Sequence, residues 1–418
     1  MTRGQAVTVG MGSMIGAGLF VVWAPAAAAA GPLLLLSLAI VAIVAGANAS
    51  SSAVLAARYP AAGGTYVYGT ERLGALPGFL AGWCFVVGKT GSCVAMALTI
   101  GVYVAPDYAP VAAAVSVVAV TAANLSGLQR SATVSRIVVA IVLSVLAGLS
   151  VSVLLAHQSG TVLFRDAAGP DLSGQPSAYG VLQAAGLLFF AFAGYARIAT
   201  LGEEVRDPER TIGQAMAITF AVVLTLYVAV AVLVLGVLGP EGAARSTAPV
   251  AEVASQVWAP EWVWLVRCAA ACAAVGALLN MLLGISRTTL AMARDGHLPS
   301  ALARVDGPHQ LPRAAEVTIA VVVVVVAVSV DVRGAIGFSS FGVLLYYAVT
   351  NASALTLAGT RRGQHTVAVV GLAGCVVLVA TLPWSSVLSG ALVVALGAVW
   401  YGARLRLRGS STSFTVEG

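Results

Sequence analysis

Four glycines within nine residues interrupt the first long apolar stretch of this sequence, which covers about residues 5–30. They are Gly10, Gly12, Gly16 and Gly18. Each glycine inside a helix costs about 1 kcal/mol relative to alanine, so we expect the helix to unwind here. The helical segment that begins after the break turns its free N–H groups and its positive dipole end toward the gap. The residue types therefore predict a backbone site for an anionic group at Ile15, Gly16, Ala17 and Gly18.

A second candidate is Lys89, the only lysine among the 22 basic residues. It lies about fourteen residues, or ~21 Å, into the third long apolar stretch. A charge at that depth of a membrane costs ~2.5–3.5 kcal/mol, so the side chain should face the protein interior and have a task. It either exchanges a proton or braces the carbonyl groups of an unwound helix.

The composition places these residues in a membrane protein. The 418 residues are 59% hydrophobic and 9% charged, whereas soluble domains carry about 25% charged residues. The net charge of +6 comes without a basic patch that interleaves aromatics, so nucleic-acid binding is not indicated. The four histidines fall at the ends of apolar stretches or in loops, no acid is expected to be buried, and the five cysteines are interpreted as apolar filler. We therefore expect no enzyme, no metal and no cofactor.

The apolar stretches predict twelve membrane spans in one transport domain, residues 1–408, followed by a disordered tail at 409–418. The expected spans are 5–30, 32–57, 76–104, 110–125, 132–156, 179–201, 212–238, 261–290, 314–330, 335–357, 366–382 and 385–403. Sixteen of the 22 basic residues then lie on the side of the N-terminus and four on the other side. By the positive-inside rule, both termini are expected in the cytoplasm, in the multi-pass topology of a cell-membrane protein.

The sixth span has a weaker interruption, where aromatic residues run into Gly194. Five spans separate it from the glycine-rich segment, and an odd number places the two segments in oppositely oriented repeats. The predicted architecture is all-α, with repeat one at about 5–156, repeat two at about 179–357, and two further helices at about 366–403.

Four motifs carry a resemblance to a known family. They are Ile15–Phe20 (IGAGLF), Pro60–Tyr68 (PAAGGTYVY), Gly202–Ile212 (GEEVRDPERTI) and Ala291–Pro299 (AMARDGHLP). Their order and sequence resemble those of the amino acid–polyamine–organocation (APC) superfamily of permeases. The resemblance implies a LeuT-like five-plus-five inverted repeat with broken helices one and six, two trailing helices, and transport of amino acids or related amines.

The resemblance also implies where a substrate would bind. Its carboxylate would meet the N–H groups at the first break, and its ammonium group would meet freed carbonyls of Phe189, Phe190 and Ala191. Phe190 and Phe192 would form a hydrophobic wall or gate beside Gly194. Ordinary core or lipid-facing packing is the alternative for these aromatics.

Several single residues have two interpretations each. Some proton-coupled relatives have a lysine in helix five in place of a sodium ion, so Lys89 is a hypothetical substitute for it. Arg197 stands near a position where many relatives have an acid, which disfavours cationic substrates; it could instead snorkel to water. Asn280 is a candidate for lining the cavity or for joining helices, and Tyr346 and Tyr347 are gate candidates.

The predicted function is a secondary active transporter that moves an amino acid by alternating access, coupled to protons or by exchange. A neutral amino acid is favoured. Polyamines, organic amines or anionic amino acids are alternative substrates, and a substrate sensor on the same scaffold is an alternative function. The expected partners are the small-molecule substrate, the lipid bilayer and, for a coupled mechanism, a proton. Oligomeric state is left open.

Overall fold

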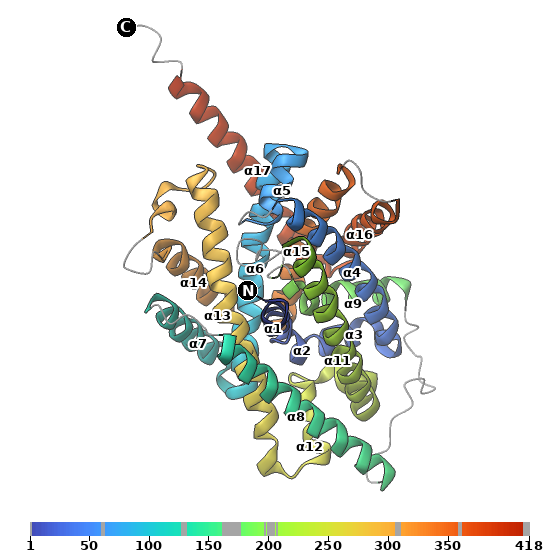
Figure 1. The fold of residues 1–418 in the computed structure, drawn as a ribbon. Coiled ribbons are helices and arrows are strands. Elements are labelled where there is room, and N and C mark those ends of the chain that lie inside the picture. Colours follow the sequence, from blue (N-terminus) through green and yellow to red (C-terminus); the bar gives the residue numbers. More distant parts are fainter. Residues whose placement is uncertain are drawn as a thin grey trace.

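The computed structural model describes residues 2–59, 63–126, 132–160, 177–195, 198, 205, 208–305, 311–357 and 362–412. Within these ranges the regular structure is helical, apart from one isolated bridge residue, Leu311 (Figure 1). The helices are α1 (Arg3–Met14), α2 (Gly18–Val21), α3 (Trp23–Ala30), α4 (Leu34–Arg58), α5 (Thr65–Leu73), α6 (Ala75–Val104), α7 (Ala109–Leu125), α8 (Ala132–Gln158), α9 (Ala178–Phe192), α11 (Pro208–Arg245), α12 (Pro249–Val257), α13 (Trp264–Arg294), α14 (Arg313–Ala327), α15 (Val332–Leu355), α16 (Arg362–Thr381) and α17 (Trp384–Thr412).

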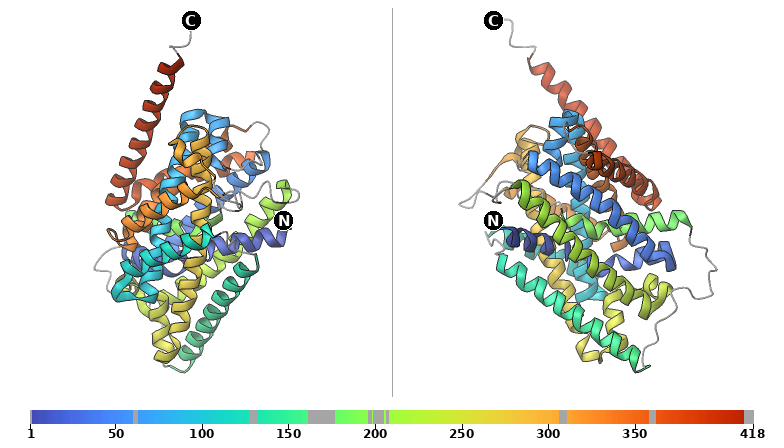
Figure 2. Two further views of the ribbon diagram at one scale, coloured as in Figure 1. Left: turned by 90° about the vertical axis from the view of Figure 1, so that its left-hand side faces the viewer. Right: turned by 45° about the vertical axis from the view of Figure 1, so that its right-hand side comes forward.

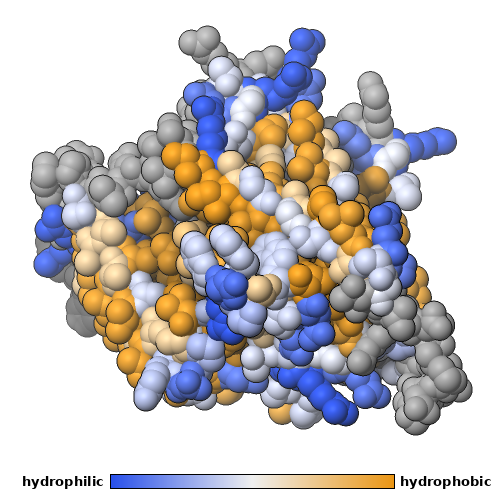
Figure 3. All heavy atoms as spheres, turned by 90° about the horizontal axis from the view of Figure 1, so that it is seen from below, coloured by the Kyte–Doolittle hydropathy of each residue, from blue (hydrophilic) through white to orange (hydrophobic). Residues whose placement is uncertain are grey.

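Eleven helical segments of the described chain are long and apolar enough to cross a membrane. The predicted ninth span is α14, which has 15 residues because the chain turns at Val328–Val330 before α15 begins. The count of twelve spans therefore stays a prediction. Apolar side chains form broad areas of the face in Figure 3, with hydrophilic groups between them. Such a surface is stable in lipid and not in water.

The C-terminal boundary differs from the prediction. α17 continues to Thr412, so the first residues of the predicted tail, 409–412, are helical. In Figures 1 and 2 the end of this helix leads away from the other helices. No proline, the residue that most strongly ends a helix, follows Pro383 in the sequence. Residues 413–418 lie outside the described chain.

α6 is a largely buried helix, and it packs extensively against both α13 and α15. It crosses α15 where Gly88 faces Gly342: a Cβ atom on Gly342 would lie 2.8 Å from the Gly88 Cα atom. The two backbones therefore touch, and only glycine fits at the crossing. One turn further along, the hydroxyl oxygens of Ser92 and Ser339 are 2.6 Å apart. These contacts fix the position of Lys89, which follows Gly88 directly.

We predict that Gly342→Ala lowers the free energy of unfolding by about 1–3 kcal/mol, because the new methyl group overlaps α6. Gly284→Ala on α13 is the matched control, since its Cβ atom would have no neighbour within 4 Å. Thermal unfolding of both purified variants in detergent measures the difference. Equal midpoints for the two variants would contradict backbone contact at this crossing.

Candidate functional site

The first predicted break is present between α1 and α2. Ile15 leaves the helical conformation, with φ −81° and ψ 75°, and its N–H group makes the last bond of α1, to Met11. The next backbone donor along the chain with a hydrogen bond is Leu19. In the described structure, the N–H groups of Gly16, Ala17 and Gly18 therefore have no hydrogen-bond acceptor. Three free donors at the start of a helical segment form a site of positive potential.

The second predicted break is a tightening of the helix. α9 keeps α-helical geometry to Phe192 and continues as a 3-10 turn, Ala193–Tyr195. The carbonyl of Phe189 accepts a bond from the Ala193 N–H group, so it is not free as we had expected. A 3-10 turn is a common helix ending, and it moves the exposed carbonyls two to four residues further along the chain.

The two breaks lie against each other, and glycine makes this possible. A Cβ atom on Gly18 would lie 2.7 Å from the Cα atom of Ala191. A Cβ atom on Gly194 would fall on the backbone of Ser13, the residue before the end of α1. Both glycines are therefore required by close packing of the α1–α2 segment on α9 and the 3-10 turn that follows it.

Two polar side chains bind the carbonyl groups at the breaks. The Tyr227 hydroxyl of α11 lies 2.8 Å from the carbonyl oxygens of both Met14 and Ala191. The Lys89 ammonium group donates to the carbonyl of Ala193 at 2.9 Å. Both side chains are buried. Sequence reasoning missed Tyr227, although a tyrosine within a long apolar helix is a signal, since a buried hydroxyl needs a partner.

A small cavity of about 20 Å³ lies between the breaks. That is room for about one water molecule. Its walls are apolar except for backbone groups, two serines and Lys89, and Lys89 is their only ionisable side chain. The lining residues are Ser13, Met14, Gly16, Ala17, Gly18, Lys89, Ser92, Met96, Phe190, Ala191, Gly194 and Met281.

Comparison with known proteins identifies the family of the chain. A family model described as amino acid permease matches residues 4–401. The chain belongs to the amino acid permease family. It is 55% identical to a protein of Mycobacterium tuberculosis named as an uncharacterized transporter, over 96% of this chain and 90% of that protein. A vacuolar cationic amino acid transporter of Arabidopsis thaliana is 29% identical over 85% of this chain and 59% of its own length. A branched-chain amino acid permease of Bacillus subtilis is 28% identical over 73% of this chain and 70% of its own length.

The predicted aromatic residues have separate places in the permease. Phe190 lines the cavity, whereas Phe192 packs edge-on against Tyr227 with ring centroids 4.9 Å apart. Phe189 packs edge-on against Tyr347, at 5.7 Å between centroids. Phe189 and Phe192, the two α9 aromatics that do not line the cavity, therefore hold the break against its neighbours α11 and α15.

The other predicted residues that the structure describes do not line this cavity. Tyr346 accepts a bond from the Thr65 N–H group at the start of α5, and Tyr347 packs edge-on against Tyr346. Ile15 is buried, and Asn280 on α13 is half-buried. The predicted Arg197 lies outside the described residues, as do residues 202–204 and 206–207 of the Gly202–Ile212 motif.

One expectation about acidic residues is wrong. Glu316, near the start of α14, is fully buried, although no buried acid was expected. Its carboxylate oxygens have no hydrogen-bond partner among the described residues, and Asn124 of α7 is beside it. Glu316 lies in the first turn of a helix, and a residue at the end of a predicted span is expected at the water interface. The sequence alone therefore does not indicate that it is buried.

Two of the sequence motifs meet at one point outside the cavity. Tyr66 of α5 donates to the carboxylate of Asp295, and its oxygen is 2.9 Å from Nδ1 of His297. Burial, reinforced by Asp295, raises the pKa of the Tyr66 hydroxyl. The hydroxyl therefore keeps its proton at neutral pH and stays a donor to Asp295.

We predict that Tyr227→Phe lowers the free energy of unfolding by about 1–3 kcal/mol, because it leaves a buried carbonyl without a donor. Tyr108→Phe is the control, since Tyr108 is 71% exposed. Differential scanning fluorimetry of the two variants gives the comparison. A Tyr227→Phe protein as stable as the wild type would show that the bridge between the breaks contributes nothing.

Proposed function

We propose that the permease carries a neutral amino acid with an apolar side chain across the cell membrane by alternating access. The observation that carries this proposal is the cavity between the two breaks, which is lined by the residues with free N–H groups, Gly16–Gly18, and by Ala191 of the second break. A zwitterion presents a carboxylate to the first break and an ammonium group to the second. The dipole of the α2–α3 segment favours the carboxylate at its start.

The second break retains capacity for an ammonium group. Ala191 lines the cavity, and Ala193 lies two residues further along the chain. The carbonyl of each accepts one bond from a protein side chain, and a carbonyl oxygen has two lone pairs. The side chain of the substrate would then face Met96, Phe190 and Met281, which are apolar. This lining favours a side chain such as that of leucine, isoleucine or valine.

The charge of the cavity supports a neutral substrate rather than a cationic one. Lys89 is the only ionisable side chain among the lining residues, and no carboxylate accompanies it there. A second positive charge on the substrate would be repelled at low dielectric. We therefore place the permease with the relative named for branched-chain amino acids rather than with those named for cationic ones.

The transport cycle requires the cavity to enlarge, because an amino acid does not fit in about 20 Å³. We propose the twelve-span, inverted-repeat arrangement with cytoplasmic termini, in which the broken helices are the moving parts. The contact of Tyr66 with Asp295 and His297 would then belong to the cytoplasmic closure. Opening on that side would separate α5 from the end of α13.

The test is uptake into liposomes that contain the purified permease. We expect labelled leucine, isoleucine or valine to accumulate when a pH gradient is imposed, with arginine and glutamate more than tenfold slower. Gly18→Ala should abolish uptake by filling the contact with Ala191. Gly12→Ala should retain it, because its Cβ atom would stay 3.6 Å from its neighbour. Faster uptake of arginine than of leucine would overturn the proposed specificity, and leucine binding without uptake would indicate a sensor.

We further propose that Lys89 couples transport to protons by releasing its own. Lys89→Arg keeps a positive charge near the carbonyl of Ala193 but cannot deprotonate at accessible pH. We expect this variant to exchange labelled for unlabelled substrate and to lose accumulation driven by the pH gradient. Lys89→Met should lose both activities. Full gradient-driven accumulation by Lys89→Arg would leave Lys89 as a brace only.

A further inference from the structure

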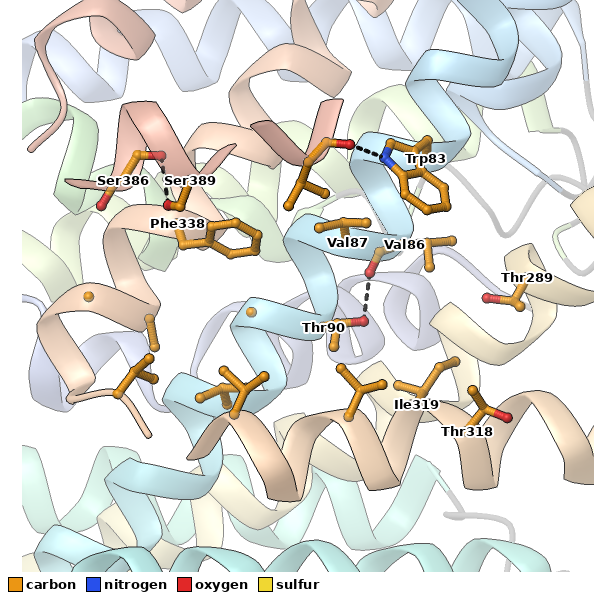
Figure 4. A pocket seen from close by; sticks show the side chains of 18 of the residues that line it. Trp83, Val86, Val87, Thr90, Thr289, Thr318, Ile319, Phe338, Ser386 and Ser389 are labelled. Carbon is orange, nitrogen blue, oxygen red and sulfur yellow. Dashed lines mark hydrogen bonds between the residues drawn. The ribbon is translucent and has the colours of Figure 1, made fainter. Parts of the chain in front are cut away.

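A second, much larger cavity lies on the other side of α6 from the substrate site. It is an open groove of about 730 Å³ between α14 and the helices α6, α13, α15 and α17 (Figure 4). α14 contributes one continuous stripe: Ala315, Ile319, Val322 and Val326. From Ala315 to Val326 this stripe is ~16 Å long, and one leaflet of a bilayer is about half of ~30 Å. The groove therefore matches the depth of one leaflet.

The polar groups on most of the wall are already used. The hydroxyls of Thr90 and Thr318 donate to carbonyls in the preceding turn of their own helices, and Ser389 does the same. The indole N–H group of Trp83 donates to the carbonyl of Val393. What remains exposed to the groove from these residues is carbon. Its occupant must therefore be apolar along most of its length.

Thr289 is the exception. It is 4% exposed, lines the groove, and its hydroxyl has no hydrogen-bond partner within the described structure. Figure 4 shows this hydroxyl directed into the groove. Thr289 lies five residues before the end of α13, which is about 7.5 Å along the helix axis. That depth is where the ester groups of a phospholipid lie, below the headgroup.

Two exposed arginines stand at the same end of the groove. Arg304 follows the lining residue Leu302 by two positions, and Arg313 precedes the lining residue Ala315 by two. Cationic side chains at a membrane surface attract anionic headgroups and hydrogen-bond to phosphate. The end of the groove thus offers, in order of depth, positive charge, a free hydroxyl donor and a carbon-lined channel.

We propose that this groove binds one anionic phospholipid. An acyl chain fills the space between α14 and α6, the Thr289 hydroxyl donates to an ester carbonyl, and Arg304 and Arg313 hold the phosphate. The other candidate occupants fit less well. Water would meet carbon over most of the groove, and a second copy of this chain would leave the Thr289 hydroxyl unpaired unless it supplied an acceptor.

Native mass spectrometry of the purified permease, titrated with palmitoyl-oleoyl phosphatidylglycerol, tests the proposal. We expect one lipid to bind at least tenfold more tightly than any further lipids. Val326→Phe fills the groove and should remove this tight binding. Val325→Phe is the matched control on the same helix, since Val325 is 58% exposed and does not line the groove. Uptake of substrate and the unfolding midpoint of each variant show that it is folded.

Two further variants test the headgroup end. Thr289→Val keeps the shape and removes the donor, so the tight binding should weaken several-fold. Arg304→Gln combined with Arg313→Gln should remove the preference for phosphatidylglycerol over phosphatidylcholine. Equal lipid binding by Val326→Phe and Val325→Phe would overturn the site. A dimer of chains that Val326→Phe dissociates, with no tightly bound lipid, would overturn it in favour of a protein interface.

Discussion

Lipid cannot satisfy the hydrogen bonds of a peptide group, and this constraint governs how the permease can hold broken helices in a membrane. At the two breaks the described structure provides donors for carbonyl groups but no acceptors for three N–H groups. Carbonyl groups of Met14, Ala191 and Ala193 receive bonds from Tyr227 and Lys89. The N–H groups of Gly16, Ala17 and Gly18 receive nothing from the described residues. The protein thus stabilises the acceptors itself and leaves the donors for what enters the cavity.

α6 separates two environments, and each of its faces has a distinct composition. One face carries Lys89, Ser92 and Met96 toward the breaks. The opposite face carries Val86, Thr90 and Val94 toward the carbon-lined groove. The contact of Gly88 with Gly342 fixes the rotation of the helix between them. A change in the tilt of α6 would move the lining residues of both cavities. Filling the groove would therefore also change the shape of the cavity between the breaks.

The fold class and the first break follow from the sequence, because they depend on properties that single residues carry. Apolar stretches and four closely spaced glycines are sufficient to indicate a membrane helix that unwinds. The inward orientation of Lys89 could also be predicted from the sequence, since a charged side chain at that depth of the membrane must face the protein interior. What the sequence does not contain is the pairing of distant elements. Tyr227 is 213 residues from Met14, and nothing local in α11 indicates which carbonyl it meets.

Two errors have the same origin. Glu316 was expected at a water interface because it begins a helix, but α7 packs over it through Asn124. The carbonyl of Phe189 was expected to be free because a glycine follows, but the helix tightens into a 3-10 turn before it opens. In both cases the local sequence indicates where an element ends, and the three-dimensional arrangement around that end decides what it contacts.

The hydroxyl of Tyr227 has a single proton and lies at equal distances from two carbonyl oxygens. That one proton is therefore shared between the end of α1 and the end of α9. In the proposed cycle, an ammonium group that also bound these two carbonyl oxygens would join the same two segments a second time. The empty and loaded proteins would then differ in stiffness as well as in content.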